Sequence, residues 1–465
     1  VWDFIQNVAI NRGSHALKFG AEYRIIKFPF FQVPYPHGEM NFNRNETAYP
    51  SVANSLNTLT GDDMASFLLG NINNGRISTN NFISSEKLAW AFYAQDDWKV
   101  NSKLTVNIGI RYELFSPIGE KFGRQSNFVY DNLTLYIPKG KDQDAPLPPN
   151  FASAFPNVTV SRGQVDKYMI PWDKTNIAPR IGFAYALRPK TVLRAGYGIF
   201  YGGEENQGGN PNRGESVPFN QSTDLARPAG NSIFDVNSYF TGGFHAGFPS
   251  NVFSLPAPVS FRGVAVNFRN GMVHKWNFAV QQELPWQSAL EVAYVGNHQS
   301  HQLFQPDWNA CPNLGTTASI SCNDLRPTPK IGGISGTASF GYGNYQGLTT
   351  KFEKRYSQGL QILTSYTYGN AKANTGTTLS GSTGFGIPNP RDYASGYSQA
   401  AWDVRHNFTT SFNYEIPFGK GKKYGGNMNT VANAVAGNWQ LNGILTLHTG
   451  SPYTLRWNGC QGIGK

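Results

Sequence analysis

The 465-residue sequence predicts an all-β protein, an antiparallel transmembrane β-barrel with short turns at one end and long loops at the other. Three observations lead to this class. The composition is polar but poor in charge, apolar and polar residues alternate along many segments, and short connections alternate with long ones. Together they disfavour a chain of ordinary soluble domains.

The composition favours many strands. Charged residues make up 15% of the chain, against roughly 25% in ordinary soluble domains, while aromatic residues reach 14% and glycine occurs 50 times. Such an aromatic content is too high for a disordered chain. The sequence has no apolar run of about 18 residues that would form a transmembrane helix, and three cysteines are too few for a disulfide-built scaffold. Helical periodicity is almost absent, with residues 62–69 as the best short candidate.

Period-two alternation is clearest in residues 104–115. Ile108 and Tyr112 belong to an apolar face of this segment, whereas Arg111 belongs to a polar one. A segment of this kind is a strand with one face in an apolar environment and the other in water.

The same unit recurs as a pair of strands joined by a turn. Six such hairpins, about twelve strands of roughly ten to fourteen residues, are longer than the usual strand of globular proteins. The predicted pairs are 2–10 with 17–25, 88–98 with 104–115, 177–187 with 191–199, 276–284 with 290–294, 348–356 with 360–368, and 408–416 with 439–447.

The connections alternate in length. Five of the six hairpins have turns of three or four residues, whereas the segments 29–87, 116–176 and 202–272 each link two hairpins with about 60 residues or more. Links of that length are unusual in compact soluble domains, but short turns at one end and long loops at the other are expected in an outer-membrane barrel. All short turns are therefore predicted on one side of the membrane.

The two faces of the strands predict a lipid side and a lumen side. The apolar face would contact lipid, and the polar face would line a water-filled lumen, where charges do not need the pairing that a dry core requires. The polar side chains assigned to the lumen include Glu22, Arg24, Arg111, Glu113, Arg194, Lys275, Glu283, Lys351 and Glu353.

Aromatic residues gather at the predicted strand ends. Amphipathic rings favour the membrane interface, which predicts two girdles, although aromatics also favour strands in general. The predicted girdles contain Trp98, Trp286, Tyr356 and Trp439 near the short turns, and Tyr112, Tyr201, Tyr366 and Tyr368 toward the long loops.

Several of these strands carry recognisable motifs. The segments 92–99 (FYAQDDWK), 108–113 (IGIRYE) and 178–185 (APRIGFAY) resemble hairpins of TonB-dependent outer-membrane receptors. The segments 67–70 (FLLG) and 402–408 (WDVRHNF) look like the Oar-like branch of that family, the carboxypeptidase-regulatory-like receptors of the Acidobacteria type. The resemblance implies a barrel of about 22 strands with periplasmic turns and extracellular loops, preceded by a regulatory-like domain and a plug.

The resemblance also implies a role. Residues 1–465 would form the receptor's β-barrel domain as a fragment, with the plug, the N-terminal domain and the C-terminal strands missing. The implied function is uptake of a scarce ligand (a siderophore, oligosaccharide or peptide) across the bacterial outer membrane. The implied partners are outer-membrane lipid, the TonB complex through the missing N-terminal part, and an unknown small-molecule or oligomeric ligand. The alternative is an outer-membrane adhesin, a surface-binding barrel without energised transport.

Other classes have weaker support. The net charge of +10 is dispersed, with its densest cluster at 420–423, so nucleic-acid binding is not expected. His298, His301 and Asp307 have a spacing that a metal site could use, but a solvated loop explains them more simply. Asp96 and Asp97 are adjacent in a predicted strand, so they point to opposite faces and cannot serve one reaction. We therefore expect no enzyme activity, no metal and no cofactor.

The cysteines are the last candidates. Cys311 and Cys322 bracket a short stretch of a predicted external loop, where the oxidising envelope favours a disulfide. Cys460 is left without an assigned partner.

Overall fold

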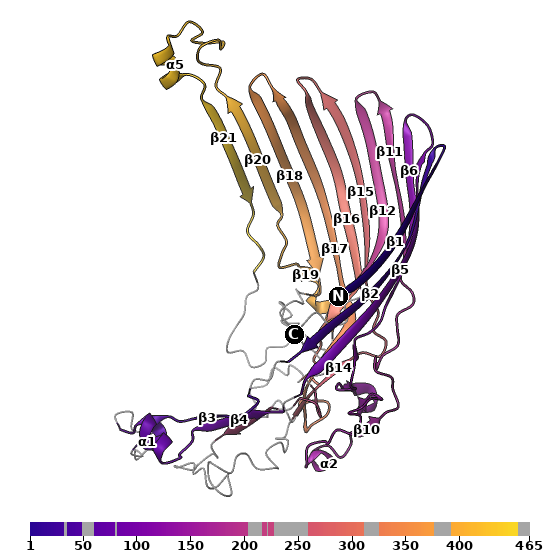
Figure 1. The fold of residues 1–465 in the computed structure, drawn as a ribbon, viewed down its shortest axis with the longest axis vertical. Coiled ribbons are helices and arrows are strands. Elements are labelled where there is room, and N and C mark those ends of the chain that lie inside the picture. Colours follow the sequence, from indigo (N-terminus) through magenta and orange to yellow (C-terminus); the bar gives the residue numbers. More distant parts are fainter. Residues whose placement is uncertain are drawn as a thin grey trace.

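One large sheet dominates the computed structural model, which describes residues 1–31, 35–48, 60–79, 81–202, 216–220, 222–226, 259–310, 325–375 and 392–453. Twelve of its strands follow one another in the order β1-β2-β5-β6-β11-β12-β15-β16-β17-β18-β20-β21, and each pair of neighbours is antiparallel. Figure 1 shows them as a curved sheet that does not close into a ring. The predicted disulfide partners Cys311 and Cys322, and also Cys460, lie outside the described residues.

The six predicted hairpins are confirmed. Their strands are β1 (Trp2–Arg12) with β2 (His15–Phe30), β5 (Ile83–Lys99) with β6 (Leu104–Phe115), β11 (Ile177–Arg188) with β12 (Thr191–Gly202), β15 (Gly271–Leu284) with β16 (Ser288–Phe304), β17 (Ile331–Ser357) with β18 (Leu360–Ala373), and β20 (His406–Glu415) with β21 (Gln440–His448). The predicted strand length was wrong for several of them. β21 has 9 residues, β5 and β16 have 17, and β17 has 27. The longer strands continue beyond the alternating apolar residues, and their backbones keep pairing there, as in Asn297 of β16 with Tyr345 of β17.

Turn chemistry explains why these hairpins reverse where they do. Between β5 and β6, the Asn101 side chain accepts hydrogen bonds from the backbone N–H groups of Lys103 and Leu104 at 2.8 and 3.0 Å. Gly13 and Gly359, in the turns after β1 and β17, have φ of +60° and +76°, a backbone region in which glycine is unstrained. Short turns of this kind fix the strand register on either side.

The sheet has two free edges in the part of the chain that the structure describes. β1 pairs only with β2, and β21 pairs only with β20. Every residue of β1 is exposed. In Figure 1 these two strands do not meet.

Small elements lie at the end of the sheet opposite the short turns (Figure 1). They are β3 (Glu39–Asn41), η1 (Arg44–Glu46), α1 (Asp63–Leu68), β4 (Asn74–Ser78), β7 (Gly119–Glu120), β8 (Asn127–Val129), η2 (Tyr130–Asn132), β9 (Thr134–Ile137), α2 (Phe151–Ala154), β10 (Thr159–Arg162), β13 (Ser222–Ala226), β14 (Val259–Val264), η5 (Tyr393–Gly396) and β19 (Ser398–Gln399). The short helix expected at residues 62–69 is α1, whose N-terminus is capped by the Asp62 side chain. Another helix of the described residues, α5 (Thr430–Ala436), lies at the other end, between β20 and β21.

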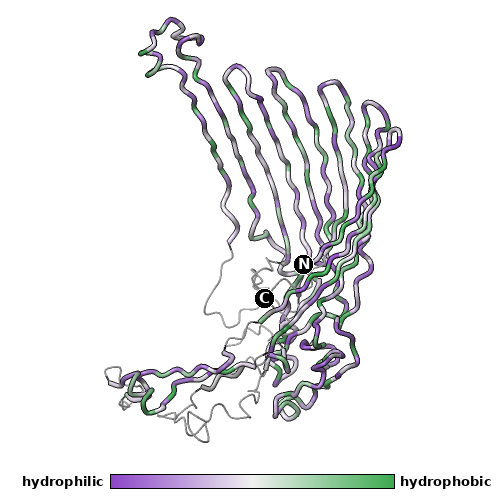
Figure 2. Tube along the Cα trace, in the orientation of Figure 1, coloured by the Kyte–Doolittle hydropathy of each residue, from purple (hydrophilic) through white to green (hydrophobic). Residues whose placement is uncertain are grey.

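The sheet has no conventional core. Large apolar side chains such as Phe4, Phe92, Ile108, Ile181 and Leu348 are exposed on it, and Figure 2 shows hydrophobic and hydrophilic residues alternating along the strands. The tightly packed core instead lies in the small elements, around Phe128, Phe261 and Ile334. Among the described helices, none is long and apolar enough to span a membrane.

Candidate functional site: a polar sheet face with a folded cap

The register of the sheet keeps one face polar from strand to strand. Arg194 lies opposite Ala279 of β15, and this row continues through Ala293 and Thr349 to Thr367. Residues at even spacing from this row share its face. All nine charged residues that the sequence assigned to a lumen fall on this surface, which we call the polar face. Their facing a lumen stays a prediction, since the sheet is open.

The first four of these residues form one ion-pair network on β1, β2 and β6. The Arg24 guanidinium donates to Asp3 and Glu22, with its Nη2 at 3.0 and 2.6 Å from their carboxylate oxygens. Arg111 reaches the second oxygen of Glu22 at 2.9 Å and donates to Glu113 at 2.8 Å. Two guanidinium groups thus hold three carboxylates, and the chain Asp3–Arg24–Glu22–Arg111–Glu113 crosses the polar face. Asp3 was not predicted, although its position between Trp2 and Phe4 in an alternating segment could have placed it on the polar face.

A second polar group lies on the same face, nearer the short turns. Asp97 accepts hydrogen bonds from Lys18 at 2.9 Å, Asn107 at 2.6 Å and Gln95 at 3.1 Å. The neighbouring Asp96 contacts His15 instead, at 2.6 Å. The two carboxylates therefore bond to different partners, in keeping with the opposite faces predicted for them.

Lys275 lies beside an aromatic ring rather than a carboxylate. The Phe200 ring lies between two cations, with the Lys275 Nζ 5.2 Å and the Arg180 Cζ 4.6 Å from its centroid. Both distances are within the range of cation–π attraction. Arg194, further along β12, lies between Ala184 and Ala279 in the register.

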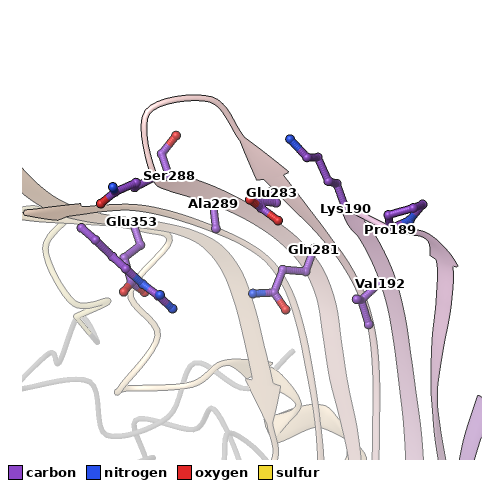
Figure 3. Close-up of a pocket in the computed structure, with 10 residues that line it drawn as sticks. Pro189, Lys190, Val192, Gln281, Glu283, Ser288, Ala289 and Glu353 are labelled. Atoms are coloured by element: carbon purple, nitrogen blue, oxygen red, sulfur yellow. The ribbon is translucent and has the colours of Figure 1, made fainter. Parts of the chain in front are cut away.

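A cavity of about 470 Å³ lies on the polar face at the short-turn end. Its charged walls are Lys190, Glu283, Glu353 and Arg355. Figure 3 shows Gln281, Glu283 and Glu353 around it, contributed by β15 and β17. Lys351 approaches Glu353 at 3.2 Å, so Glu283, Lys351 and Glu353 gather here as a mixed-charge group. Both signs of charge are present, and the cavity has the chemistry of a hydrated passage rather than of a dry pocket.

The loop end is covered by a small folded unit, which we call the cap: β8, β9, β10, α2, residues 216–220, β14 and the first residues of β17. Its buried core contains Phe128, Leu135, Phe151, Phe155, Val217, Phe261, Ile331 and Ile334. The Phe128 and Phe261 rings stack with centroids 4.5 Å apart. β14 runs parallel to the start of β17, so the cap is built directly onto a strand of the sheet.

Polar side chains of the link between β16 and β17 hold that link against the start of β17, which is part of the cap. The Asn309 amide donates to the carbonyl groups of Thr328, Ile331 and Gly332 at 2.9–3.0 Å. Asp307 accepts from the Ile334 N–H at 2.7 Å and from Arg326 at 3.1 Å. These bonds satisfy buried backbone groups that would otherwise be costly. The sequence analysis did not identify this unit, although its short apolar runs could have indicated a second core.

The Asp307 carboxylate therefore binds Ile334 and Arg326 rather than the two histidines with which a metal site would combine it. His298 pairs in register with His274 and contacts Asn344 through Nδ1 at 2.8 Å. Across the described residues, His, Cys, Asp and Glu nowhere form a group of three that could hold a metal ion.

A carboxylate outside the strands joins two of the long connections. Asp173 accepts from the Thr175 N–H and hydroxyl at 3.0 and 2.6 Å and from the Asn270 N–H at 2.9 Å. Burial alone would raise the pKa of Asp173, but these hydrogen bonds and the charge of Arg269 outweigh it and hold that pKa below its usual range. The ionised carboxylate is thus the form that ties the β10–β11 link to the β14–β15 link.

Comparison with known families agrees with this architecture. The family model described as "Outer membrane beta barrel domain" matches residues 1–463. The chain belongs to this family, and it is an outer-membrane protein. A comparison with curated proteins finds no match.

The solved structures with a similar fold include outer-membrane transporters. The outer membrane transporter YddB from Escherichia coli is 12% identical, with a TM-score of 0.44 over 89% of this chain and 39% of that one. The FrpB iron transporter from Neisseria meningitidis (F5-1 variant, apoprotein) is 11% identical, with a TM-score of 0.38 over 89% and 41%. The copper transporter OprC is 8% identical, with a TM-score of 0.41 over 87% and 40%. The chain thus spans about two fifths of the length of these proteins.

Proposed function

We propose that this chain is the barrel domain of a TonB-dependent receptor that takes up a scarce ligand across the outer membrane. The observation that carries the proposal is the polar face, which continues across the whole sheet. A network such as Asp3–Arg24–Glu22–Arg111–Glu113 cannot face hydrocarbon, because removing even paired charges from water is costly. The polar face therefore requires water on its side of the barrel wall.

The number of strands indicates how wide the water-filled interior would be. A barrel of eight strands has an interior just wide enough for its own side chains to fill. The sheet already has twelve strands in sequence, so any barrel it belongs to encloses more space than side chains can occupy. A wide, hydrated passage suits the translocation of a ligand larger than an ion, and a siderophore, an oligosaccharide or a peptide fits this description.

The sequence motifs favour energised uptake over free diffusion. The hairpin formed by β5 and β6 contains the segments FYAQDDWK and IGIRYE, which resemble TonB-dependent receptors. In TonB-dependent receptors a plug closes the barrel, and the TonB complex acts on a part of the protein that precedes the barrel. We propose that this protein has both the plug and the contact with TonB.

Uptake by intact cells tests this function. Cells that produce the full-length protein would be given a labelled ferric siderophore, oligosaccharide or oligopeptide, with and without a protonophore. We expect at least one label to accumulate inside energised cells only, since transport against a gradient needs inner-membrane energy. Cells without the protein provide the background.

The adhesin alternative predicts a different pattern. A surface-binding barrel would retain label at the cell surface to the same extent with and without the protonophore. That result, or accumulation that persists in cells lacking TonB, would contradict the proposal.

A further inference from the structure

One of the six hairpin turns differs from the others. Five turns, between β1 and β2 through β17 and β18, contain two to four residues, whereas β20 ends at Glu415 and β21 begins at Gln440. The intervening residues 416–439, which we call the β20–β21 unit, contain α5 and the densest basic cluster of the sequence. Figure 1 shows the unit projecting beyond the short-turn end of the sheet.

The unit is compactly folded. The Asn433 side chain on α5 accepts a hydrogen bond from the Lys420 N–H at 2.5 Å. Gly437 packs so closely on Asn433 that an added Cβ would lie 2.2 Å from its Oδ1, and Gly419 has φ of +133°. Both positions need glycine for this close approach. The lysine-bearing loop and the helix are therefore held together as one body.

The outer side of that body is apolar. Val431 and Val435, one helical turn apart, are 77% and 72% exposed, while Asn433 on another side of α5 packs inside the unit. Trp439 is 60% exposed and donates from its indole N–H to the Val435 carbonyl at 3.0 Å. An amphipathic helix normally buries its apolar side. In α5 the apolar side is exposed instead, which favours contact with an apolar partner.

The unit is also uniformly basic. Residues 416–439 contain three lysines and no aspartate or glutamate. Lys422 pairs with Glu415 at 2.6 Å, and Glu415 also accepts from the Tyr356 hydroxyl at 2.7 Å, which fixes the unit to the β17–β18 hairpin. Lys420 and Lys423 are exposed, and Lys423 lies over the Tyr424 ring at 5.3 Å.

The apolar side continues the apolar face of the sheet. Tyr414 pairs with Leu441 in the register, and both are exposed on the face opposite the polar one. Trp439 precedes Leu441 by two residues and Ile416 follows Tyr414 by two, so both extend this face into the unit. In an outer-membrane barrel this face contacts lipid, and the unit begins where the lipid-facing surface ends.

We propose that the β20–β21 unit binds anionic phospholipid and lies in the headgroup layer on the short-turn side. Val431, Val435 and Trp439 enter the boundary between headgroups and acyl chains, while Lys420 and Lys423 contact lipid phosphates. Apolar side chains with adjoining lysines are the pattern of interfacial helices, and anionic headgroups attract lysines close to the surface. The inference depends on membership of the outer-membrane barrel family and not on transport.

Spin-label accessibility in bilayers tests the proposal. The full-length protein, with Cys311, Cys322, Cys460 and every other cysteine replaced by serine, would carry a nitroxide at Val431→Cys in vesicles of phosphatidylethanolamine with about one quarter phosphatidylglycerol. The matched control is Asn427→Cys, an exposed polar position of the same unit. We expect the label at 431 to be at least about threefold less accessible to an aqueous nickel quencher than the label at 427, and more accessible to oxygen.

The charge contribution has its own variants. Lys420→Gln with Lys423→Gln should raise the nickel accessibility at 431 in the anionic vesicles. The control pair, Lys99→Gln with Lys103→Gln, removes two exposed lysines at another short turn and should leave it unchanged.

Two results would overturn the proposal. If the label at 431 is as water-accessible as that at 427 in these vesicles, which contain no other protein, the apolar side is not a lipid-binding surface, and a protein partner becomes the alternative. The assignment of anionic lipid is wrong if the nickel accessibility at 431 is unchanged both in purely zwitterionic vesicles and in the variant without Lys420 and Lys423.

Discussion

The cap and the polar face are stabilised by different physical means. The cap buries Phe128, Phe261 and Ile334 completely, each at 0% exposure, so it resembles the interior of a small soluble domain. The polar face buries little and relies on backbone ladders with partly exposed charges such as Arg24 and Glu22. The loss of one side chain should therefore be severe in the cap and mild on the polar face.

The largest effect is expected for Phe261→Ala. The ring is fully buried and stacks on Phe128, and truncation of such a residue costs about 3–5 kcal/mol. We expect the cap to become sensitive to protease added to intact cells. The large sheet should stay folded, so that the unheated protein still migrates differently from the heated protein in detergent gels. Val266→Ala, at an exposed apolar position nearby, should leave protease resistance unchanged. Equal protease resistance of the Phe261 variant would show that the cap does not depend on this core.

A smaller effect is expected at Gly20 on β2. An added Cβ would lie 2.3 Å from Tyr93 Cε1, and Tyr93 donates to Asn7 at 2.8 Å, so Gly20→Ala must displace the ring. Overpacking of this kind costs about 1–3 kcal/mol. The unfolding temperature in detergent should fall, and Tyr93→Ala in the same chain should recover part of the loss. A Gly20 variant as stable as the parent would mean that the tyrosine moves at no cost.

Breaking the charge network should matter less still. Arg111→Met removes the link between Glu22 and Glu113, but water reaches these groups, so the expected loss is about 1 kcal/mol. Denaturant unfolding in detergent would measure it, and the loss should shrink at high salt. A loss as large as that of Phe261→Ala would show that the polar face is drier than its exposure indicates.

The smallest effect concerns pH and the tie at Asp173. Because the pKa of Asp173 is held below its usual range, the tie is complete above the unfolded pKa of about 3.9 and is lost as the pH falls through the lower folded value. The protection of the Thr175 and Asn270 amides against hydrogen exchange, relative to the unfolded chain at the same pH, should therefore fall only in acid. In Asp173→Asn this acid dependence should disappear. A loss of protection already at neutral pH would contradict the assignment.

The sequence was most informative where the environment repeats. Alternation in segments such as 104–115 predicts the strands, their two faces and the position of Arg111, because the same apolar and polar faces recur on every strand of the sheet. The partners of Arg111 depend on register across β2 and β6, which a single sequence does not specify. The cap was missed because Phe128 and Phe261 lie far apart in the chain and meet only through tertiary packing. The sequence shows the lysine cluster at 420–423. The hydrogen bond from Lys420 to Asn433, which holds this cluster against the helix that carries Val431 and Val435, is seen only in the folded protein.

The length of β17 has a mechanical consequence. Its 27 residues correspond to about 90 Å of extended chain, roughly twice the thickness of a bilayer with its headgroups. One end pairs with β14 in the cap, and the other reaches the turn at Gln358. The cap and the short-turn end are therefore joined by one continuous strand, so a displacement of the cap acts directly on a strand of the large sheet.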